Sequence, residues 1–426
     1  MKILLVLAIA LLAGLFMTRL AKIWNLPAVT AYLVAGILIG PYCFGQLGIE
    51  GLGFIGSGAD RMEYVKQFDL ISQVALGFIA FAMGNEFRLS ELKTIGKKAV
   101  VIAIFQALMA TVAVDLVLFL LHQFWLGDRL SMPVVLTMGA IATATAPAAT
   151  LMVVKQYKAD GPLTRILLPV VALDDAVGLV VFAISFGIAK ALDVPGGTVD
   201  VVSILVNPLI EIVGSLLLGA VIGMLFSLSE KLFQSRSKRM SIAVAYTFLA
   251  VGLSMMKIHV GKVEIGFSSL LVCMMLGTIF CNVSDISEEL MERCDRWTGP
   301  IMVLFFVISG AGLELDVFRD WKIVVVGIVF ILVRSIGKIE GAKLSSGFMK
   351  CEPKVQKYLG ITLLPQAGVA LGMSLIAMNQ LDSDSGRLIR SISLFAVLIY
   401  ELFGPIMTKW ALGRAGEIPE EHRNAD

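Results

Sequence analysis

The stretch from Pro169 to Ser185 reads PVVALDDAVGLVVFAIS and places two adjacent acidic residues inside an apolar run. An ionisable side chain at the centre of a bilayer costs about 2.5–3.5 kcal/mol even on the mildest insertion scale. Asp174 and Asp175 therefore indicate a functional site within a membrane-spanning helix. Ion or proton translocation is the usual role of such residues.

The composition of the whole chain predicts an all-α polytopic membrane protein. Its 426 residues are 58% hydrophobic and 16% charged, with a mean hydropathy of +0.87, which an ordinary soluble domain does not reach. A hydrocarbon core about 30 Å thick needs about 20 apolar residues per helix. This criterion predicts thirteen spans: residues 3–20, 27–45, 66–84, 99–121, 133–154, 164–189, 203–227, 240–256, 263–281, 299–316, 323–343, 356–379 and 388–411.

The distribution of basic residues predicts the orientation of the chain in the membrane. The loops after odd-numbered spans, together with the C-terminal tail, hold 22 of the 35 lysines and arginines, and the other side holds 11. We therefore expect a cytoplasmic C-terminus and an external N-terminus. The first span is expected to be retained, because Arg19 and Lys22 follow its apolar run and no small-residue cleavage site precedes them.

The remaining composition argues against several partners and cofactors. The net charge of +2 follows from the charge bias of the loops and does not suggest a nucleic-acid partner. Five scattered cysteines and three histidines form no metal-ligand spacing, and we expect Cys273 and Cys281 to be buried packing thiols. The chain has no Walker A glycine loop, which disfavours an ATP-driven pump. We expect a transporter that is not an enzyme and carries no cofactor.

A weak internal repeat suggests two copies of one structural unit. A Gly-x-Glu-apolar signature that begins at Gly84 recurs at Gly312. The same shift along the chain takes Asp174 next to Glu401, the only carboxylate of the last span. Seven spans separate the copies, and an odd number inverts the second copy in the membrane. Inverted repeats are typical of secondary transporters, although chance similarity between glycine-rich spans is the alternative.

Two spans, in corresponding places of the two copies, contain residues that interrupt a helix. They are Thr143, Thr145, Ala146 and Pro147 in the fifth span, and Pro365, Gln366 and Gly368 in the twelfth. Proline removes a backbone donor, and nearby hydroxyl and amide groups can satisfy the backbone groups that it frees. Either proline alone is as consistent with simple packing. With the repeat and the paired aspartates, both predict broken helices that form a binding site at the membrane midplane.

Basic residues inside the eleventh span complete the charged set. Arg334 and Lys338 lie four residues apart and share one helix face, so each requires a carboxylate. For Lys338, which is near the cytoplasmic end, extension into the headgroups is the alternative. For Glu401 we favour a buried ion pair with Arg334 over direct cation binding.

Together these motifs resemble those of the monovalent cation:proton antiporters, most closely the NapA-type and Kef-type bacterial members. The likeness rests on thirteen spans, a Thr-x-Pro break, the Asp-Asp pair on the next helix, the Arg-x-x-x-Lys pair and the sequence PQAGVALG from Pro365. It covers essentially the whole chain. The resemblance implies the inverted-repeat fold of that superfamily (NhaA/NapA-like), with two crossed broken helices, in the inner membrane of a bacterium.

The resemblance also implies a domain organisation and a mode of action. Residues 1–98 and 191–316 would form a scaffold that makes a homodimer, and residues 99–190 and 317–411 would form the two bundles of a mobile core. Residues 412–426 would be a polar cytoplasmic tail, which we expect to be solvated and mobile. Transport in these proteins resembles an elevator in which the core slides past the scaffold.

Roles carry over only where residues match the family motif. Asp175 matches the main ion-binding carboxylate, and Asp174 matches a position that is Asn in electroneutral members and Asp in many electrogenic ones. Lys338 matches the lysine that pairs with the first aspartate. One departure concerns the first break, where several relatives have Thr-Asp-Pro and this chain has Ala146 between Thr145 and Pro147. The nucleotide-binding domain of Kef-type systems is also absent from the sequence.

The sequence therefore predicts the exchange of H⁺ for a monovalent cation that binds at Asp175 and Asp174, with help from Thr145. We expect Na⁺ to be the preferred cation and Li⁺ to be transported as well, with K⁺ as the alternative substrate. An exchange of two protons for one cation would make the cycle electrogenic. This exchange would serve pH homeostasis. The alternatives are a K⁺/H⁺ antiporter or K⁺ efflux protein, a cation-coupled solute symporter of related fold, and a channel.

Overall fold

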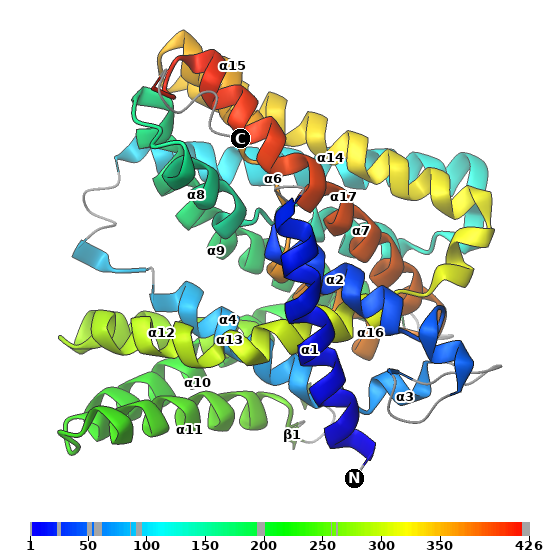
Figure 1. Ribbon diagram of the computed structural model, residues 1–426. Coiled ribbons are helices and arrows are strands. Elements are labelled where there is room, and N and C mark those ends of the chain that lie inside the picture. The colour runs from blue at the N-terminus through cyan, green and yellow to red at the C-terminus, as the bar shows by residue number, and fades with distance from the viewer. Residues whose placement is uncertain are drawn as a thin grey trace. The chain divides into compact units, whose positions relative to one another are not determined.

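The computed structural model of the chain describes residues 2–23, 27–48, 53–54, 62–85, 87–90, 96–193, 201–256, 258–260 and 263–419. The chain divides into two compact units. Unit 1 comprises Met1–Gln67, Ile95–Asp193 and Phe306–Asp426, and unit 2 comprises Phe68–Thr94 and Val194–Phe305. Each unit is described by itself, and its elements are labelled in Figure 1.

Unit 1 contains most of the long helices. Its α-helices are α1 (Lys2–Ile23), α2 (Ala28–Ile39), the short α3 (Glu63–Lys66), α6 (Lys97–Leu121), α7 (Met132–Ile141), α8 (Pro147–Gln156), α9 (Pro162–Leu192), α14 (Trp321–Phe348), α15 (Pro353–Thr362), α16 (Gly368–Gln380) and α17 (Ser383–Ala415). Shorter turns of helix are η1 (Phe44–Leu47), η3 (His122–Leu126), η4 (Gly127–Arg129) and η5 (Leu315–Arg319).

Unit 2 contains α4 (Asp69–Asn85), α10 (Val201–Glu230), α11 (Arg236–Ser254) and α12 (Ser269–Val283), with a two-stranded antiparallel hairpin of β1 (Ile258–Val260) and β2 (Val263–Ile265). Helix α13 (Ser287–Ala311) begins in unit 2 and ends in unit 1. Within unit 2, Gly219 and Gly223 face α12, where a side-chain carbon would meet the carbonyls of Val272 and Leu276. The Gly-x-x-x-Gly spacing thus allows α10 and α12 to pack closely.

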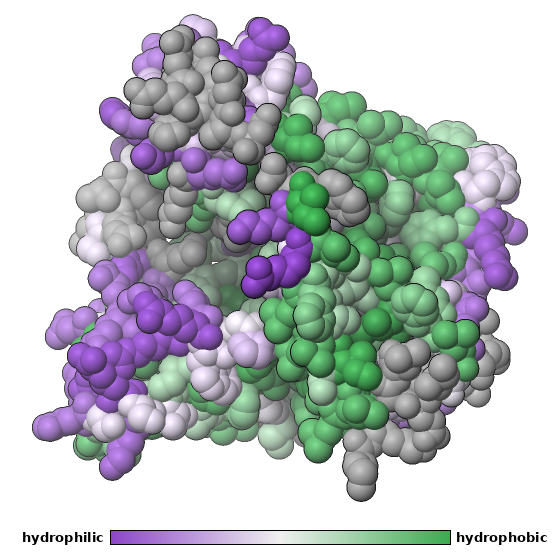
Figure 2. Space-filling model, viewed as in Figure 1, coloured by the Kyte–Doolittle hydropathy of each residue, from purple (hydrophilic) through white to green (hydrophobic). Residues whose placement is uncertain are grey.

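Every predicted span overlaps a helix, and the fifth and twelfth each overlap a pair of helices with an interruption between them. Within the described residues, six helices are long and apolar enough to cross a membrane: Ile3–Ile23, Ala28–Leu47, Lys97–Leu126, Pro162–Leu192, Leu209–Glu230 and Ser383–Ala415. Apolar side chains such as Leu4 and Phe16 lie exposed on α1, and Figure 2 shows the hydrophobic residues that gather over this helix. These surfaces fit a lipid solvent and not water.

Helices α6 and α14 pack side by side in unit 1, as Figure 1 shows. A side-chain carbon on Gly337 would lie 2.8 Å from the Cα atom of Ala110, and one on Gly341 would lie 2.9 Å from that of Gln106. Only glycine permits so close an approach of two helices. The contact places the Lys338 side of α14 against the Gln106 side of α6.

The structural repeat has a different period from the one expected. Helices α7, α8 and α9 recur as α15, α16 and α17, and the shift that takes Met132 to Pro353 takes each helix start in the first set to the corresponding start in the second. This shift is shorter than the one between Gly84 and Gly312. It takes Asp174 to Phe395 and not to the neighbourhood of Glu401, so the expected correspondence with Glu401 was wrong. A short Gly-x-Glu match at span ends cannot fix the register of the helices that follow it.

The C-terminal segment is more ordered than expected for a solvated tail. Helix α17 runs to Ala415, and Glu417 and Ile418 are buried. Ile418 joins a hydrophobic cluster with Leu163 and Val355. The prediction of a mobile tail from residue 412 is therefore wrong for residues 412–418, because these residues have apolar and hydrogen-bonding partners that their local composition does not reveal.

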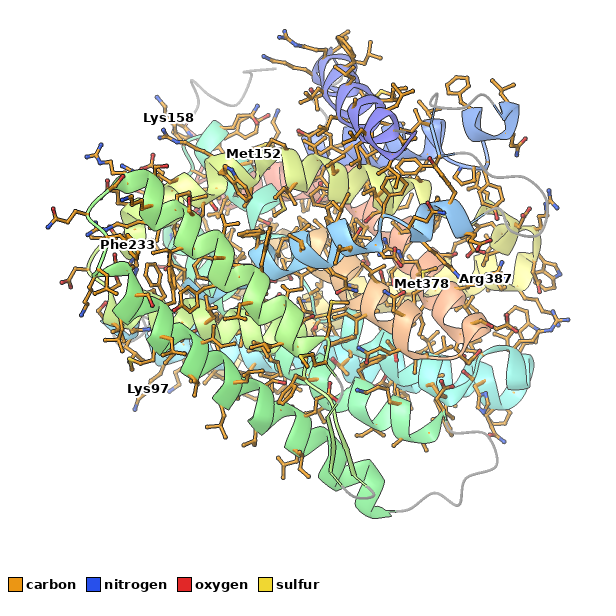
Figure 3. All side chains as sticks on the ribbon, turned by 90° about the horizontal axis from the view of Figure 1, so that it is seen from below. Lys97, Met152, Lys158, Phe233, Met378 and Arg387 are labelled. Carbon is orange, nitrogen blue, oxygen red and sulfur yellow. The ribbon has the colours of Figure 1, made fainter. Side chains whose placement is uncertain are left out.

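Near the opposite end of α17, close packing joins it to α16. A side-chain carbon on Gly386 would lie 2.8 Å from the Cα atom of Met378. Met378 and Arg387 are labelled together in Figure 3. Arg387 donates to the buried carboxylate of Glu314, the glutamate of the second Gly-x-Glu signature, at 2.7 Å from Nε. Glu86, the glutamate of the first signature, lies outside the described residues.

Candidate functional site

The two helix interruptions face each other in unit 1. The first, residues 142–146, separates α7 from α8, and Pro147 opens α8 at a position where a missing backbone N–H costs nothing. The second, residues 363–367, contains Pro365 and separates α15 from α16, which begins at Gly368. Such breaks free backbone N–H and carbonyl groups that need partners inside a membrane.

Hydrogen bonds from one interruption to the other supply those partners. The Ala146 N–H donates to the Pro365 carbonyl at 2.8 Å, and the Gln366 side-chain amide donates to the Ile141 carbonyl at 2.9 Å. The Thr145 hydroxyl donates to the Leu363 carbonyl at 3.3 Å. The two interruptions therefore stabilise each other.

Arg334 links both interruptions from α14. Its guanidinium donates to the Ala142 carbonyl at 3.0 Å, the Ala144 carbonyl at 2.6 Å and the Leu364 carbonyl at 2.9 Å. The guanidinium carbon lies 4.3 Å from the ring centroid of Tyr400. Arg334 is fully buried, so these carbonyls and the ring replace water around its charge.

The expected ion pair between Arg334 and Glu401 is not formed. Among the described residues no salt bridge joins them, because the carbonyls freed by the two breaks occupy the guanidinium. Glu401 is 1% exposed on α17, and one turn further on Gly404 packs against Pro365. Glu401 therefore lies near the second interruption without closing a charge pair with Arg334.

Lys338 brings the first interruption and the aspartate pair together. Its ammonium lies 2.8 Å from Asp174 Oδ2 and 2.9 Å from the Thr145 hydroxyl, and it also donates to the Thr143 carbonyl. These three acceptors match the three donors of an ammonium group. Lys338 and Asp174 are both 0% exposed, which rules out extension of the lysine into the headgroups. The structure thus contains the lysine–aspartate pair that the family resemblance implies.

The second oxygen of Asp174 accepts a hydrogen bond from the Gln106 amide of α6. Gln106 was not among the predicted site residues, although a lone amide in the middle of the span 99–121 was a visible signal. Asp115, the acidic residue of that span, was not predicted either, and its carboxylate packs directly against Gly139 of α7. Both residues belong to the inner faces of unit 1.

Asp175 occupies the adjacent position on α9 and is also buried. It is 4% exposed, whereas Asp174 is 0% exposed. Neighbours on an α-helix point about 100° apart, so Lys338 can hold one carboxylate while the other faces elsewhere. One turn later, a side-chain carbon on Gly178 would lie 2.9 Å from the Thr143 hydroxyl. Glycine at this position lets α9 approach the first interruption.

Two adjacent carboxylates and a lysine lie buried where two interrupted helices meet. This arrangement is typical of an ion-binding site in a membrane protein. The chain belongs to the sodium/hydrogen exchanger family, because the model of the family's transmembrane region matches residues 7–413. It is an integral membrane protein of a family of cation/proton antiporters. Among the described residues, no group of three or more His, Cys, Asp or Glu side chains is placed to hold a metal ion.

Solved structures with the same fold include a sodium/proton antiporter. The structure of MjNhaP1 from Methanocaldococcus jannaschii at pH 8 matches with a TM-score of 0.71 and 18% identity, over 98% of this chain and 99% of that chain. An electron-microscopy structure of the same antiporter matches with a TM-score of 0.67 and 16% identity, over 96% of each chain. No protein of curated function matches the sequence. At these identities the likeness shows the fold alone.

Proposed function

We propose that the protein exchanges H⁺ for a monovalent cation, with Na⁺ as the main substrate, Li⁺ accepted and K⁺ as the alternative. The observation that carries this proposal is the buried Asp174–Lys338 pair beside Asp175, at the meeting point of two interrupted helices. Family membership supplies the reaction class. Oxygen ligands suit a hard alkali ion, and a nearby lysine disfavours a divalent one.

Competition for a carboxylate accounts for the exchange. A dehydrated cation binds Asp175 when that carboxylate is ionised, and a proton displaces the cation by neutralising it. The Thr145 hydroxyl donates to Leu363, accepts from Lys338 and has a second lone pair for a cation ligand. Two protons for each cation would make the cycle electrogenic.

The architecture supports an alternating-access mechanism. We infer thirteen spans in which the second copy of the repeat is inverted and the two broken helices cross. Arg334 and the hydrogen bonds between the interruptions tie the broken helices into one body. In this mechanism, α6–α9 and α14–α17 form a core that moves as a rigid body past a dimeric scaffold. This elevator-like movement would carry the site across the membrane.

Contacts between loop ends support the alternation of sides predicted from charge. On one side Asp160 N–H donates to the Glu417 carbonyl, and Lys354 donates to the Ala415 carbonyl. These residues follow the fifth, eleventh and last spans, which charge counting assigns to the cytoplasm. Arg129 pairs with Asp320, and both follow even-numbered spans. We infer an external N-terminus, a cytoplasmic C-terminus and insertion in a bacterial inner membrane.

The test uses proteoliposomes that hold an acid interior and a pH-sensitive dye. Addition of Na⁺ should dequench the dye with the unaltered protein, and Asp175→Asn should abolish the response. Asp160→Asn changes an exposed aspartate of the same charge and should leave the response intact. Dequenching that persists in Asp175→Asn would remove Asp175 from the mechanism. A protein that responds to none of Na⁺, Li⁺ and K⁺ would overturn the antiport itself.

Potassium is retained as the alternative substrate because of one feature of the first interruption. Ala146 stands where several relatives carry an acidic residue, and its N–H is bonded to the second interruption. The site therefore has one fewer oxygen ligand with which to compensate a strongly hydrated small ion. The same dye assay with K⁺ in place of Na⁺ compares the two cations directly.

A further inference from the structure

The last turns of α17 carry a groove that ion exchange does not use. Its volume is about 430 Å³, and its lining residues are Ile406, Lys409, Trp410, Gly413, Arg414 and Ile418. These residues all belong to unit 1. The groove therefore combines an apolar floor with two basic side chains.

Aromatic rings hold the basic groups of this region in place. The Lys409 ammonium lies 4.6 Å from the ring centroid of Tyr157, and the Arg414 guanidinium carbon lies 5.8 Å from that of Trp410. Tyr358 of α15 meets Trp410 edge to face, with their centroids 5.9 Å apart. Tryptophan and tyrosine together with lysine and arginine are typical of the boundary between membrane and water.

An exposed apolar face of α17 leads to the groove. Phe403, Ile406 and Trp410 are 57%, 60% and 46% exposed and lie three and four residues apart. That spacing puts them on one side of the helix, and Arg414 continues the same side one turn further. In a membrane protein such a face contacts acyl chains, so the basic groups lie where the headgroup of the same lipid would be.

Arg414 is not required to complete the helix end. The Gly416 N–H donates to the carbonyls of Gly413 and Leu412, and Lys354 donates to the carbonyl of Ala415. Within the described part of the chain, no carboxylate lies within salt-bridge distance of Arg414. A basic group beside an apolar groove at the membrane boundary calls for an anion attached to a hydrophobic chain.

We propose that this groove is a binding site for an anionic phospholipid, with the acyl chain along the Phe403–Trp410 face and the phosphate at Lys409 and Arg414. In the orientation inferred above, the lipid belongs to the cytoplasmic leaflet, where anionic lipids create a negative surface. The groove lies beside the Glu417 contact with α9, so the bound lipid flanks the inner end of the helix that carries Asp174 and Asp175.

The experiment measures the binding of dioleoyl phosphatidylglycerol to the purified full chain in neutral detergent by native mass spectrometry. Each basic group near an anionic lipid contributes about fivefold, so Lys409→Gln with Arg414→Gln should weaken binding about 30-fold. The control, Lys231→Gln with Arg236→Gln, removes two exposed basic groups near the connection between α10 and α11 and should change binding by less than about twofold. Thermal unfolding without lipid verifies that both double variants are folded.

Two further measurements distinguish a lipid phosphate from free phosphate as the ligand. Dioleoyl phosphatidylcholine, which carries no net charge, should bind the unaltered protein weakly. Its affinity should not exceed that of phosphatidylglycerol for the Lys409/Arg414 double variant. Inorganic phosphate should not displace phosphatidylglycerol from the unaltered protein. Equal binding of phosphatidylglycerol by the unaltered protein and that variant would overturn the proposal. Displacement by phosphate alone would also overturn it, by showing an anion site without a lipid. Neither outcome affects the dye assay, so the lipid site and antiport fail separately.

Discussion

Among single residues, Asp174 and Lys338 form an ion pair that is completely buried. Both side chains are 0% exposed, so each charge depends on the other and on the hydrogen bonds around it. Removing one member of such a pair costs about 3–5 kcal/mol, because an uncompensated charge stays buried, whereas replacing both members is much less costly.

This asymmetry gives a prediction about stability. Lys338→Gln or Asp174→Asn alone should lower the thermal unfolding temperature in detergent, and the double variant should recover most of the loss. The coupling would be about 2 kcal/mol or more, as for neighbouring residues in one network. Additive losses in the double variant would show that the pair does not act as a unit.

Site residues could be predicted from the sequence only where a charged side chain stands in an apolar span. Asp174, Asp175 and Lys338 stood out because charges are costly in a bilayer. The partners of Arg334 were mispredicted because they are backbone carbonyls, and carbonyl groups leave no mark in a sequence. In the sequence, only carboxylates such as that of Glu401 could be recognised as acceptors for Arg334. In the structure, three backbone carbonyls accept its hydrogen bonds instead.

At the scale of helices, the interruptions are stabilised by contacts between distant segments. Arg334 spans carbonyls of both interruptions with three separate N–H groups. A lysine keeps the charge but presents it as a single point, so it cannot reach both interruptions with the same geometry.

Arg334→Lys is therefore expected to destabilise the chain by about 1–3 kcal/mol, the cost of leaving buried carbonyls without donors. Exchange should fall with it, because the two broken helices would no longer move together. Thermal unfolding in detergent and the dye assay measure both effects. The matched control is the exposed Arg165→Lys. A variant as stable and active as the unaltered protein would contradict the role of Arg334 as the link.

The helix that carries the aspartates is held at its first turn by the far end of the chain. Glu417 accepts from the N–H groups of Leu163 and Thr164 at 2.6 and 2.8 Å, and from the Thr164 hydroxyl at 2.7 Å. A carboxylate at a helix N-terminus also interacts favourably with the helix dipole. No local pattern near residue 417 indicates this contact, which is why the tail was expected to be solvated.

Glu417→Ala should destabilise the protein by about 1–3 kcal/mol, because it leaves buried N–H groups without an acceptor. The expected result is a lower thermal unfolding temperature in detergent. Glu352→Ala is the control, since Glu352 is exposed and its side chain makes no capping hydrogen bond. An equal effect of the two substitutions would show that Glu417 does not anchor α9.

The order of the helices was predictable, but their register across the repeat was not. Apolar runs about as long as a bilayer is thick predicted all the long helices, and prolines with polar neighbours predicted both interruptions. The spacing between the two copies depends on the lengths of the connecting loops, which composition does not set. The packing of α6 against α14 depends on glycines of α14 that contact α6. The sequence shows these glycines but not the helix that they contact.

For the molecule as a whole, we propose that the charge carried in each cycle depends on Lys338. If Asp174 releases its proton while Lys338 holds the carboxylate, two protons cross for one cation. Lys338→Gln is expected to give exchange without charge movement: dye dequenching continues, while Na⁺-driven current on a solid-supported membrane disappears. An unchanged current per transported ion would exclude Lys338 from the coupling.

The proposed exchange requires one buried carboxylate that binds either H⁺ or a monovalent cation. The most direct measurement adds Na⁺ to the purified protein in weakly buffered detergent and records proton release with a pH indicator. We predict that the unaltered protein releases protons in a saturable manner and that Asp175→Asn releases none. Sodium binding without proton release by the unaltered protein, or equal release by Asp175→Asn, would show that the two ions do not compete for Asp175.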